Sequence, residues 1–152
     1  MEQITLQLYT LERCHQFWKS YIADPDMMDG SYKYDFNWVE AYYHRKVSDK
    51  SRAYFAICLA DTVIGEIQLK NLDWVEKSAT LSVHLANDRY KNRGFGTEAE
   101  RKMIAYGFDQ LHLQTIYADC LHRNQRSRHI LEKLGFQHLR DDEEFCYFVL
   151  NK

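Results

Sequence analysis

The segment Lys91-Asn92-Arg93-Gly94-Phe95-Gly96-Thr97-Glu98-Ala99 is the most informative stretch of the chain, because it places two glycines where an extended segment turns into an amphipathic helix. Gly94 and Gly96 lack a Cβ atom, so the loop can adopt positive φ and let a ligand approach its backbone closely. The first N–H groups of the following helix point outward at the positive end of the helix dipole. Arg89, Lys91 and Arg93 add positive charge around the same turn. The sequence therefore predicts a site for a phosphate or a similar anion at this loop.

The length and composition indicate one globular domain, which we expect to cover residues 1–152. The chain has a single proline and no linker, low-complexity tract or repeat that would divide it. A net charge of −2 argues against nucleic acid as a partner. The sequence contains no apolar run long enough to span a membrane and no signal-peptide pattern, so we expect no membrane partner and a cytoplasmic location.

The four cysteines do not form a recognisable metal or redox motif. Cys14, Cys58, Cys120 and Cys146 lie in apolar or amphipathic stretches, with no Cys-x-x-Cys and no histidine at zinc-site spacing. We therefore expect reduced thiols in the core and no metal site.

Hydrophobic periodicity predicts eleven elements in the order β-α-α-β-β-β-α-β-α-β-β. The predicted elements are strand 4–9, helices 11–22 and 37–47, strands 53–59, 63–69 and 79–86, helix 96–110, strand 115–120, helix 124–134, and strands 136–139 and 145–150. Gly135 is expected to end the last helix. The first run of strands reads as an antiparallel meander. The order predicts an α+β fold with a mixed, mostly antiparallel sheet.

Two motifs give the chain a family resemblance. The glycine segment 91–96 follows the fourth strand, and Asn124-Gln125-Arg126-Ser127 leads into Glu132-Lys133-Leu134-Gly135-Phe136. Together, over residues 79–136, they resemble the GNAT acyl-CoA N-acyltransferases, and most of all the branch of ribosomal-protein and spermidine N-acetyltransferases. The resemblance implies a three-layer GNAT-like domain that transfers an acetyl group from acetyl-CoA to a primary amine, either a small cationic amine or a peptide or protein N-terminus.

The same resemblance implies where acetyl-CoA would bind. The end of the fourth strand, His84, Leu85 and Ala86, would pair with the pantetheine arm like an added strand, and Asn124 would bond a pantetheine amide. Backbone N–H groups of the glycine loop would bind the pyrophosphate: Lys91, Asn92, Arg93, Gly94, Phe95, Gly96 and Thr97. The chemistry agrees, since a diphosphate suits a helix N-terminus and an arm with two amides suits an unpaired strand edge.

Three departures from the family pattern affect the interpretation. Lys91 stands where the family has Arg or Gln, so the side chain loses planar bidentate geometry. Leu131 stands where many relatives have a tyrosine that protonates the departing thiolate. The C-terminal strand pair is shorter than in the spermidine enzymes, so polyamine specificity does not carry over.

The catalytic candidates are Ser127, Glu66 and His84. Ser127, in the first turn of its helix, is where ribosomal-protein-type relatives keep a hydroxyl near the thiol; alternatively, it satisfies the helix end. Glu66 and His84 are the candidate bases, each in an otherwise apolar strand. Glu66 could instead be a solvent-facing or paired carboxylate, and His84 a satisfied sheet histidine. A water relay would need neither.

The acceptor pocket is expected in the irregular stretch from Asp26 to Trp38, where family members build it. Carboxylates and aromatic rings suit a cationic amine, and the acidic run from Asp141 to Glu144 could strengthen that field or simply be solvated. The residues expected to attract the amine are Asp26, Asp29, Tyr32, Tyr34, Asp35 and Trp38. A homodimer is one option for the assembly.

Two other classes remain open at this point. Gly94-x-Gly96-x-x-Ala99, with Asp119 after it, fits a dinucleotide-binding fingerprint, but that motif should open a parallel βαβ unit rather than follow a meander. A non-catalytic acyl-CoA-binding or regulatory module would keep the loop and lack the chemistry, which the leucine at position 131 leaves open.

Overall fold

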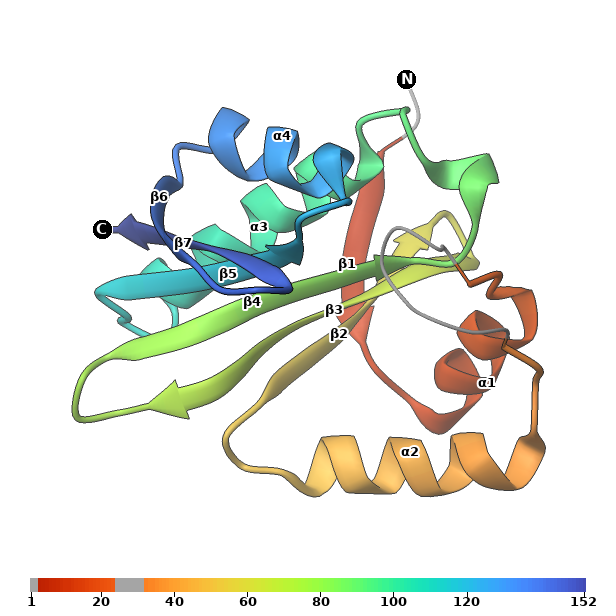
Figure 1. Cartoon of the computed structure of the whole chain (residues 1–152). Helices are drawn as coiled ribbons and strands as arrows, with labels where there is room; N and C mark the ends of the chain where they lie inside the picture. The colour runs from red at the N-terminus through yellow and green to blue at the C-terminus, as the bar shows by residue number, and fades with distance from the viewer. Residues whose placement is uncertain (1–2, 24–31) are drawn as a thin grey trace.

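The computed structural model describes residues 3–23 and 32–152 (Figure 1). Within these ranges the elements follow the predicted order. They are β1 (Ile4–Leu8), α1 (Leu11–Ser20), α2 (Phe36–Ser48), β2 (Ala53–Leu59), β3 (Thr62–Asp73), β4 (Ser78–Leu85), the 3-10 turn η1 (Asp88–Tyr90), α3 (Phe95–Asp109), β5 (Thr115–Leu121), α4 (Gln125–Lys133), β6 (Gln137–Asp141) and β7 (Phe145–Asn151). The turn η1 and the extension of β3 to Asp73 were not predicted, and the other bounds differ from the prediction by a few residues at most.

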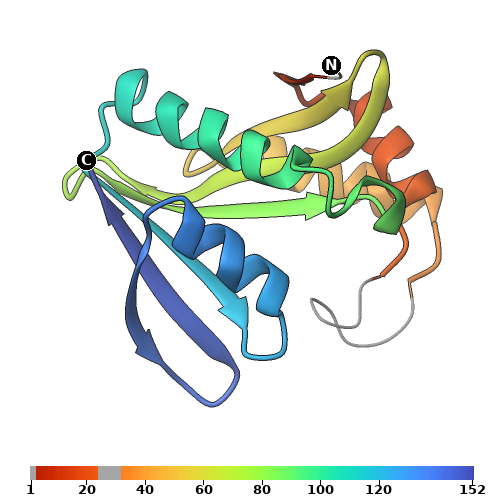
Figure 2. The ribbon, with the colours of Figure 1, turned by 90° about the horizontal axis from the view of Figure 1, so that it is seen from above.

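The strands form one sheet in the order β1-β2-β3-β4-β5-β7-β6. Every neighbouring pair is antiparallel except β4 and β5. These two pair only through Ser78–Thr80 and Thr115–Tyr117, although both strands continue for several residues. Beyond that point they diverge, as Figure 2 shows. The predicted mixed, mostly antiparallel sheet is confirmed, and it opens in its middle.

Helices cover both faces of the sheet, which gives the expected three layers. Alternate residues of β2 divide between two cores: Tyr54, Ala56 and Cys58 pack with α1 and α2, whereas Ile57 packs with α3. Leu131 of α4 belongs to the same core as α3. Neighbouring residues of β2 therefore point to opposite faces of the sheet, one covered by α1 and α2 and the other by α3 and α4.

The helix starts differ in how their backbone is satisfied. Side chains of Thr10, Asp35 and Asn124 accept N–H groups in the first turns of α1, α2 and α4. Gly94, the N-cap of α3, has φ of 84° and makes no side-chain cap. At the other end of the chain Gly135, with φ of 96°, terminates α4 as predicted.

The four cysteines are buried free thiols, as expected. Among the described residues, none of the helices combines the length and the apolar character that a membrane crossing requires.

Candidate active site

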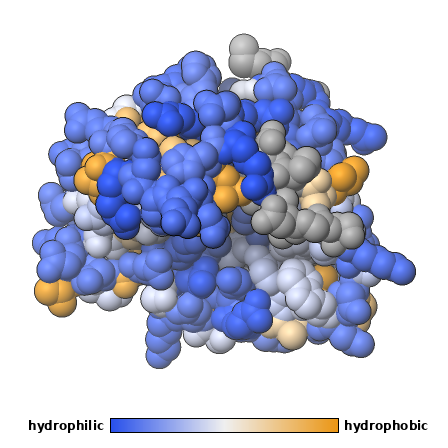
Figure 3. Space-filling model, in the orientation of Figure 1, coloured by the Kyte–Doolittle hydropathy of each residue, from blue (hydrophilic) through white to orange (hydrophobic). Residues whose placement is uncertain are grey.

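A cleft of about 480 Å³ occupies the opening between β4 and β5. On the side of α1 and α2 its wall combines the aromatic side chains of Trp18, Trp38 and Tyr42 with charged or amide residues, which are Lys46, Arg52, Gln68, Lys70, His84 and Asp119. On the side of α3 and α4 it reaches Glu100, Asn124, Ser127 and Leu131. The molecular surface in the orientation of Figure 1 is mainly hydrophilic with scattered apolar side chains (Figure 3). The cleft thus passes through the sheet and joins its two faces.

A smaller cavity of about 60 Å³ connects the cleft with the glycine loop. It is lined by Leu85, Lys91 and Gly96, together with residues that also line the cleft. The residues common to both cavities are Val83, Glu100, Asn124 and Ser127. We call these four residues the junction. A ligand that runs from the loop to the cleft must pass it.

The glycine loop presents backbone donors at the start of α3. The first helical bond runs from Glu98 N–H to the Gly94 carbonyl, at 3.0 Å, so the N–H groups of Phe95, Gly96 and Thr97 have no helical acceptor. The left-handed residues are Asn92, with φ of 59°, and Gly94. The expectation of positive φ at Gly96 is wrong, because this glycine already lies inside the helix.

Gly96 instead leaves space in the small cavity, because it has no side chain. A Cβ atom at this position would lie 3.7 Å from Leu85 Cδ1, inside the small cavity that both residues line. Lys91 beside it is almost buried and places Nζ 3.1 Å from Asp88 Oδ1, while the Arg93 guanidinium stacks 4.8 Å from the Phe95 ring centroid. Of the cations around the loop, Lys91 is therefore buried and ion-paired, whereas Arg89 and Arg93 are exposed.

One edge of β4 is open where β5 turns away. The Ala86 N–H donates to the Ile64 carbonyl of β3, at 2.7 Å, and the direction of backbone bonds alternates along an antiparallel strand. The N–H and C=O groups of Val83 and Leu85 therefore face the side that β5 leaves. Ala86 is fully buried and its carbonyl accepts the Ile22 N–H, so of the three predicted edge residues only Leu85 offers its backbone to a ligand.

Glu66 is surrounded by tyrosine side chains on the face of the sheet that α1 and α2 cover. Tyr9 donates its hydroxyl to Oε2 and Tyr42 donates to Oε1, both at 2.7 Å, and the Tyr54 hydroxyl bonds to that of Tyr42. Burial, followed by the Glu66 charge, raises the pKa of all three tyrosines. Glu66 is 2% exposed. Glu66 is therefore a buried carboxylate with hydrogen-bond partners, and the interpretation that it faces solvent is wrong.

His84 stands directly opposite Glu66 on the neighbouring strand. Its Nδ1 lies 3.5 Å from Glu66 Oε1, and its side chain lines the cleft, whereas Glu66 does not. The two residues that the sequence offered as separate bases thus form one arrangement. In it His84 borders the cleft and Glu66 lies on the side of the imidazole away from it.

Asn124 and Ser127 begin α4 at the junction. The Asn124 Oδ1 accepts the Ser127 N–H at 3.0 Å, so Asn124 provides the cap, and the interpretation in which the Ser127 hydroxyl satisfies the helix end is wrong. Ser127 is half-buried. Within the described chain no hydrogen bond engages the Nδ2 group of Asn124, which leaves this donor for a ligand.

Glu100 is a site residue that we did not predict. It lies on the second turn of α3, is 4% exposed, and makes no hydrogen bond or ion pair with any described residue. Burial raises the pKa of its carboxyl from 4.5 to about 8. Its position one helical turn after Gly96, on the buried stripe that continues through Met103, was the available signal. Leu131, by contrast, is buried in the cleft wall as an apolar residue with no proton to give.

The predicted acceptor residues mostly serve the structure. Asp26 and Asp29 lie outside the described residues. Asp35 caps α2, the Tyr34 hydroxyl bonds to His15, and the Tyr32 hydroxyl donates to the Trp18 carbonyl. Of the predicted acceptor residues that the structure describes, Trp38 is the one in the cleft wall.

No residue of the acidic run from Asp141 to Glu144 lines the cleft, although the next residue, Phe145, does. Asp142 accepts the N–H groups of Glu144 and Phe145 within its own turn. Burial and the Asp142 charge raise the pKa of Asp119 in the cleft wall, so the field of this run reaches the cleft from outside its lining.

One group of potential metal ligands occurs outside the cleft. His122, Asp141 and Cys146 bring a ligand atom each within 4.8 Å of one another. His122 Nδ1 lies 3.1 Å from Cys146 Sγ, and the Asp141 carboxylate bonds His138. Hydrogen bonds account for this cluster without an ion.

The fold and the site together define a class. A glycine loop at a helix N-terminus, a diverging β4 and β5, and a cleft through the opening are the features of an acyl-CoA N-acyltransferase. The dinucleotide alternative is wrong, because β2, β3 and β4 are antiparallel where that fold needs parallel strands. A family model described as an acetyltransferase (GNAT) domain matches residues 3–137, and the chain belongs to this family.

Individual relatives agree with the predicted branch. The chain is 29% identical over 94 residues to YdaF of Bacillus subtilis, whose name describes it as a ribosomal N-acetyltransferase. The alignment covers 62% of this chain and 51% of YdaF. The chain is 27% identical over 94 residues to spermidine N(1)-acetyltransferase of Escherichia coli, covering 62% and 50%. The chain spans about half the length of these curated relatives. Among solved structures, a spermidine N-acetyltransferase SpeG chimera from Vibrio cholerae and hSSAT superposes with a TM-score of 0.85 at 19% identity, covering 98% of this chain and 95% of that one.

Proposed function

We propose that this protein is an acetyl-CoA-dependent N-acetyltransferase that acetylates the primary amine of a small molecule or of a peptide or protein N-terminus. The observation that carries the proposal is the junction, where a cavity from the glycine loop meets a polar cleft from the opposite face of the sheet. A donor and an acceptor that enter from the two faces would meet there. Holding two reactants in one geometry supplies a large part of the rate in such a transfer.

The donor would be held mainly by backbone groups. The N–H groups of Phe95, Gly96 and Thr97 suit the pyrophosphate, within the wider segment from Lys91 to Thr97. The open edge of β4 at Val83 and Leu85 suits the two amides of the pantetheine arm. The Nδ2 group of Asn124 would donate to a pantetheine carbonyl, while its Oδ1 keeps the cap of α4.

His84 is the proposed base. A proton on Nδ1 would point toward the Glu66 carboxylate, which leaves Nε2 to accept a proton from the acceptor amine. Glu66 is a positioning residue in this scheme, since it lies beneath the tyrosines and does not reach the cleft. As the nitrogen attacks the thioester carbonyl, the C–N bond forms, the C–S bond breaks and His84 takes the proton.

Two groups at the junction would serve the departing thiolate. The Ser127 hydroxyl can donate a hydrogen bond, but its proton is too weakly acidic to be transferred. A thiol has a pKa of about 8.5, which matches the carboxyl of Glu100 with a pKa of about 8. We assign the hydrogen bond to Ser127 and the proton to Glu100, which would take the role left open by Leu131.

The alternative is a non-catalytic acyl-CoA-binding or regulatory module of the same fold. An assay of free thiol released from acetyl-CoA, run over polyamines, aminoglycosides, amino acids and peptide N-termini, separates the two. The proposal expects amine-dependent thiol release with at least one acceptor class. Bound acetyl-CoA with no thiol release over the whole panel would favour the module.

The surroundings of the protein are part of the same proposal. Four free thiols suit a reducing compartment, and we propose the cytoplasm. We also propose a homodimer as the assembly, because β6 lies at the sheet edge with all its residues exposed and such an edge can pair with a second chain.

A further inference from the structure

The acceptor side of the cleft carries positive charge at the place where the sequence led us to expect negative charge. Lys46 of α2, Arg52 before β2 and Lys70 of β3 all line it. Their separate elements converge on the α1 and α2 face of the sheet, on the same side as His84. These three cations and the candidate base His84 therefore line the same cleft.

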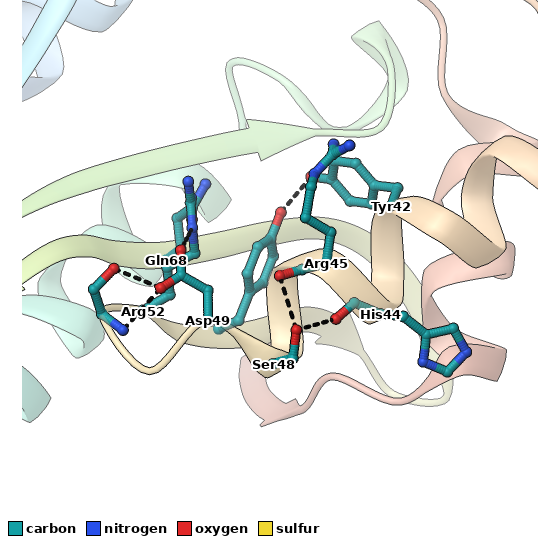
Figure 4. Close-up of polar contacts among 9 residues, drawn as sticks. Tyr42, His44, Arg45, Ser48, Asp49, Arg52 and Gln68 are labelled. Atoms are coloured by element: carbon teal, nitrogen blue, oxygen red, sulfur yellow. Dashed lines mark hydrogen bonds and ion pairs between the residues drawn. The ribbon is translucent and has the colours of Figure 1, made fainter.

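Arg52 is fixed in place by two neighbours. Its Nε donates to Asp49 Oδ2 at 2.8 Å, and its Nη1 donates to Gln68 Oε1. Figure 4 shows Arg52 held between these side chains beside the C-terminal end of α2. Gln68 is 6% exposed and its Oε1 is taken, and no described residue accepts from its Nε2 group. This buried amide therefore keeps a donor for a ligand in the cleft.

Neither of the two lysines forms an ion pair with a described carboxylate, although the charge of Lys70 acts on Asp119 and opposes the rise of its pKa. Among the described residues, neither Lys46 nor Lys70 has a carboxylate oxygen within ion-pair distance, and Lys46 Nζ lies 5.4 Å from the Tyr42 ring centroid. Burial, and then the charges of Arg52, Arg45 and Lys70, lower the pKa of Lys46 against the opposing charge of Glu66. The cations are close enough to repel one another, and an anion between them would relieve this repulsion.

The carboxylates that line the cleft do not balance these cations. Asp119 and Glu100 are the acidic residues in its described wall. Burial raises the pKa of both carboxyls, in the case of Glu100 to about 8. Asp49 is already paired with Arg52, and Glu66 lies beneath its tyrosines. Within the described wall the three cations therefore outnumber the two carboxylates.

We infer that the acceptor is a primary amine that also carries an acidic group, a carboxylate or a phosphate, and that Lys46, Arg52, Lys70 and the Gln68 amide bind this group while the amine faces His84. This inference rests on the proposed function and names its substrate class. It differs from the polyamine specificity in the names of some relatives, since a second cation would meet Lys46 and Lys70, neither of which has a described carboxylate within ion-pair distance.

A set of acceptors with the same three-carbon chain tests the inference. Propylamine is the reference without a second charged group, 1,3-diaminopropane carries a second amine, β-alanine carries a carboxylate and 3-aminopropyl phosphate carries a phosphate. Thiol release from acetyl-CoA at low ionic strength gives kcat/KM for each. We expect at least one of the acidic acceptors to exceed propylamine by about tenfold, and the two acidic arms distinguish carboxylate from phosphate.

Variants show whether the cleft causes the preference. The double variant Lys46→Gln, Lys70→Gln should reduce the advantage of the acidic acceptor to less than about threefold. The control Lys50→Gln removes one charge from an exposed lysine nearby, outside the cleft, and should leave the preference intact. An equal preference in the double variant and the wild type would overturn the inference.

Two further outcomes are decisive. Fastest turnover of 1,3-diaminopropane would overturn the inference. If none of the four is turned over, calorimetric titration of the same set into the complex with coenzyme A decides, and equal or tighter binding of the diamine would overturn it. Coenzyme A binding on the same sample keeps the two proposals apart, because loss of that binding contradicts the proposed function rather than the acceptor class.

Discussion

The two sides of the cleft are built in different ways. In the proposed scheme the donor side consists of consecutive residues, from Lys91 to Thr97, whose backbone would bind coenzyme A, with the edge of one strand beside them. The acceptor side consists of single side chains from α2, β3, β4 and β5 that meet only after folding. A substitution on the donor side should thus change coenzyme A affinity, whereas one on the acceptor side should change turnover and acceptor choice.

The largest effect is expected for His84. Replacing it by Gln removes the base and should lower kcat by about 10²- to 10⁴-fold, the usual contribution of general base catalysis. Coenzyme A affinity, measured by calorimetry, should stay within about twofold because Gln keeps the side chain polar. The matched variant Glu66→Gln should lower kcat less and shift the pH profile, since it acts through the imidazole. An unchanged rate in His84→Gln would show that water alone carries the proton.

The next effect is expected for Glu100, at the boundary between the two sides. Glu100→Gln removes the transferable proton while keeping the shape, and we expect kcat to fall by about tenfold or more. The pH dependence of the remaining activity should lose the step near the pKa of about 8. A variant with wild-type kcat and pH profile would restrict Glu100 to a structural role.

The same variant should change the pH dependence of stability. Because the pKa of Glu100 in the folded protein is raised from 4.5 to about 8, the folded state holds more protons than the unfolded state between these values. The contribution of Glu100 to stability is therefore complete below pH 4.5 and is lost as pH rises through 8, by roughly 1.4 kcal/mol per pH unit at most. Urea titrations over this range should show a smaller decline in Glu100→Gln than in the wild type.

A donor-side effect of about tenfold is expected at Gly94. Its φ of 84° admits Gly and tolerates Asn, but strains a β-branched residue. A Cβ atom added at this position would have open space within 4 Å, so any loss comes from the backbone and not from a clash. Gly94→Val should weaken coenzyme A binding by about tenfold, and Gly94→Asn by much less. Equal losses in both variants would contradict the claim that loop conformation controls affinity.

The smallest effect is expected for Ser127. Ser127→Ala removes a single hydrogen bond to the thiolate and should reduce kcat by about fivefold, with coenzyme A affinity unchanged. Asn124 keeps the cap of α4, so the melting temperature should hold. A drop in melting temperature instead of kcat would return Ser127 to a structural role.

The contrast between the two sides also explains what could be predicted from the sequence. The glycine loop and the order of elements follow local rules, and both were predicted. Glu66 and His84 were identified one by one, but their contact depends on the register of β3 against β4. Glu100 was not predicted, because a single charged residue on the apolar face of a helix carries no functional signal in the sequence. Only the opening of the sheet shows that this residue lines the cleft.

The described wall of the acceptor side contains cations that the sequence analysis did not single out. Acidic residues are conspicuous in the sequence from Asp26 to Asp35 and from Asp141 to Glu144, whereas Lys46, Arg52 and Lys70 are spread along three elements. Only the alternation of β3 and the packing of α2 against the same face bring these cations together. Charge density along a chain does not predict charge density in a cleft.

The most direct measurement is a calorimetric titration of the folded protein with coenzyme A and, in parallel, with pantetheine, which lacks the diphosphate. If the main-chain amides at the start of α3 hold the diphosphate, coenzyme A will bind with one site per chain and pantetheine at least about 100-fold more weakly. The absence of heat from coenzyme A, or equal binding of pantetheine, would contradict the account.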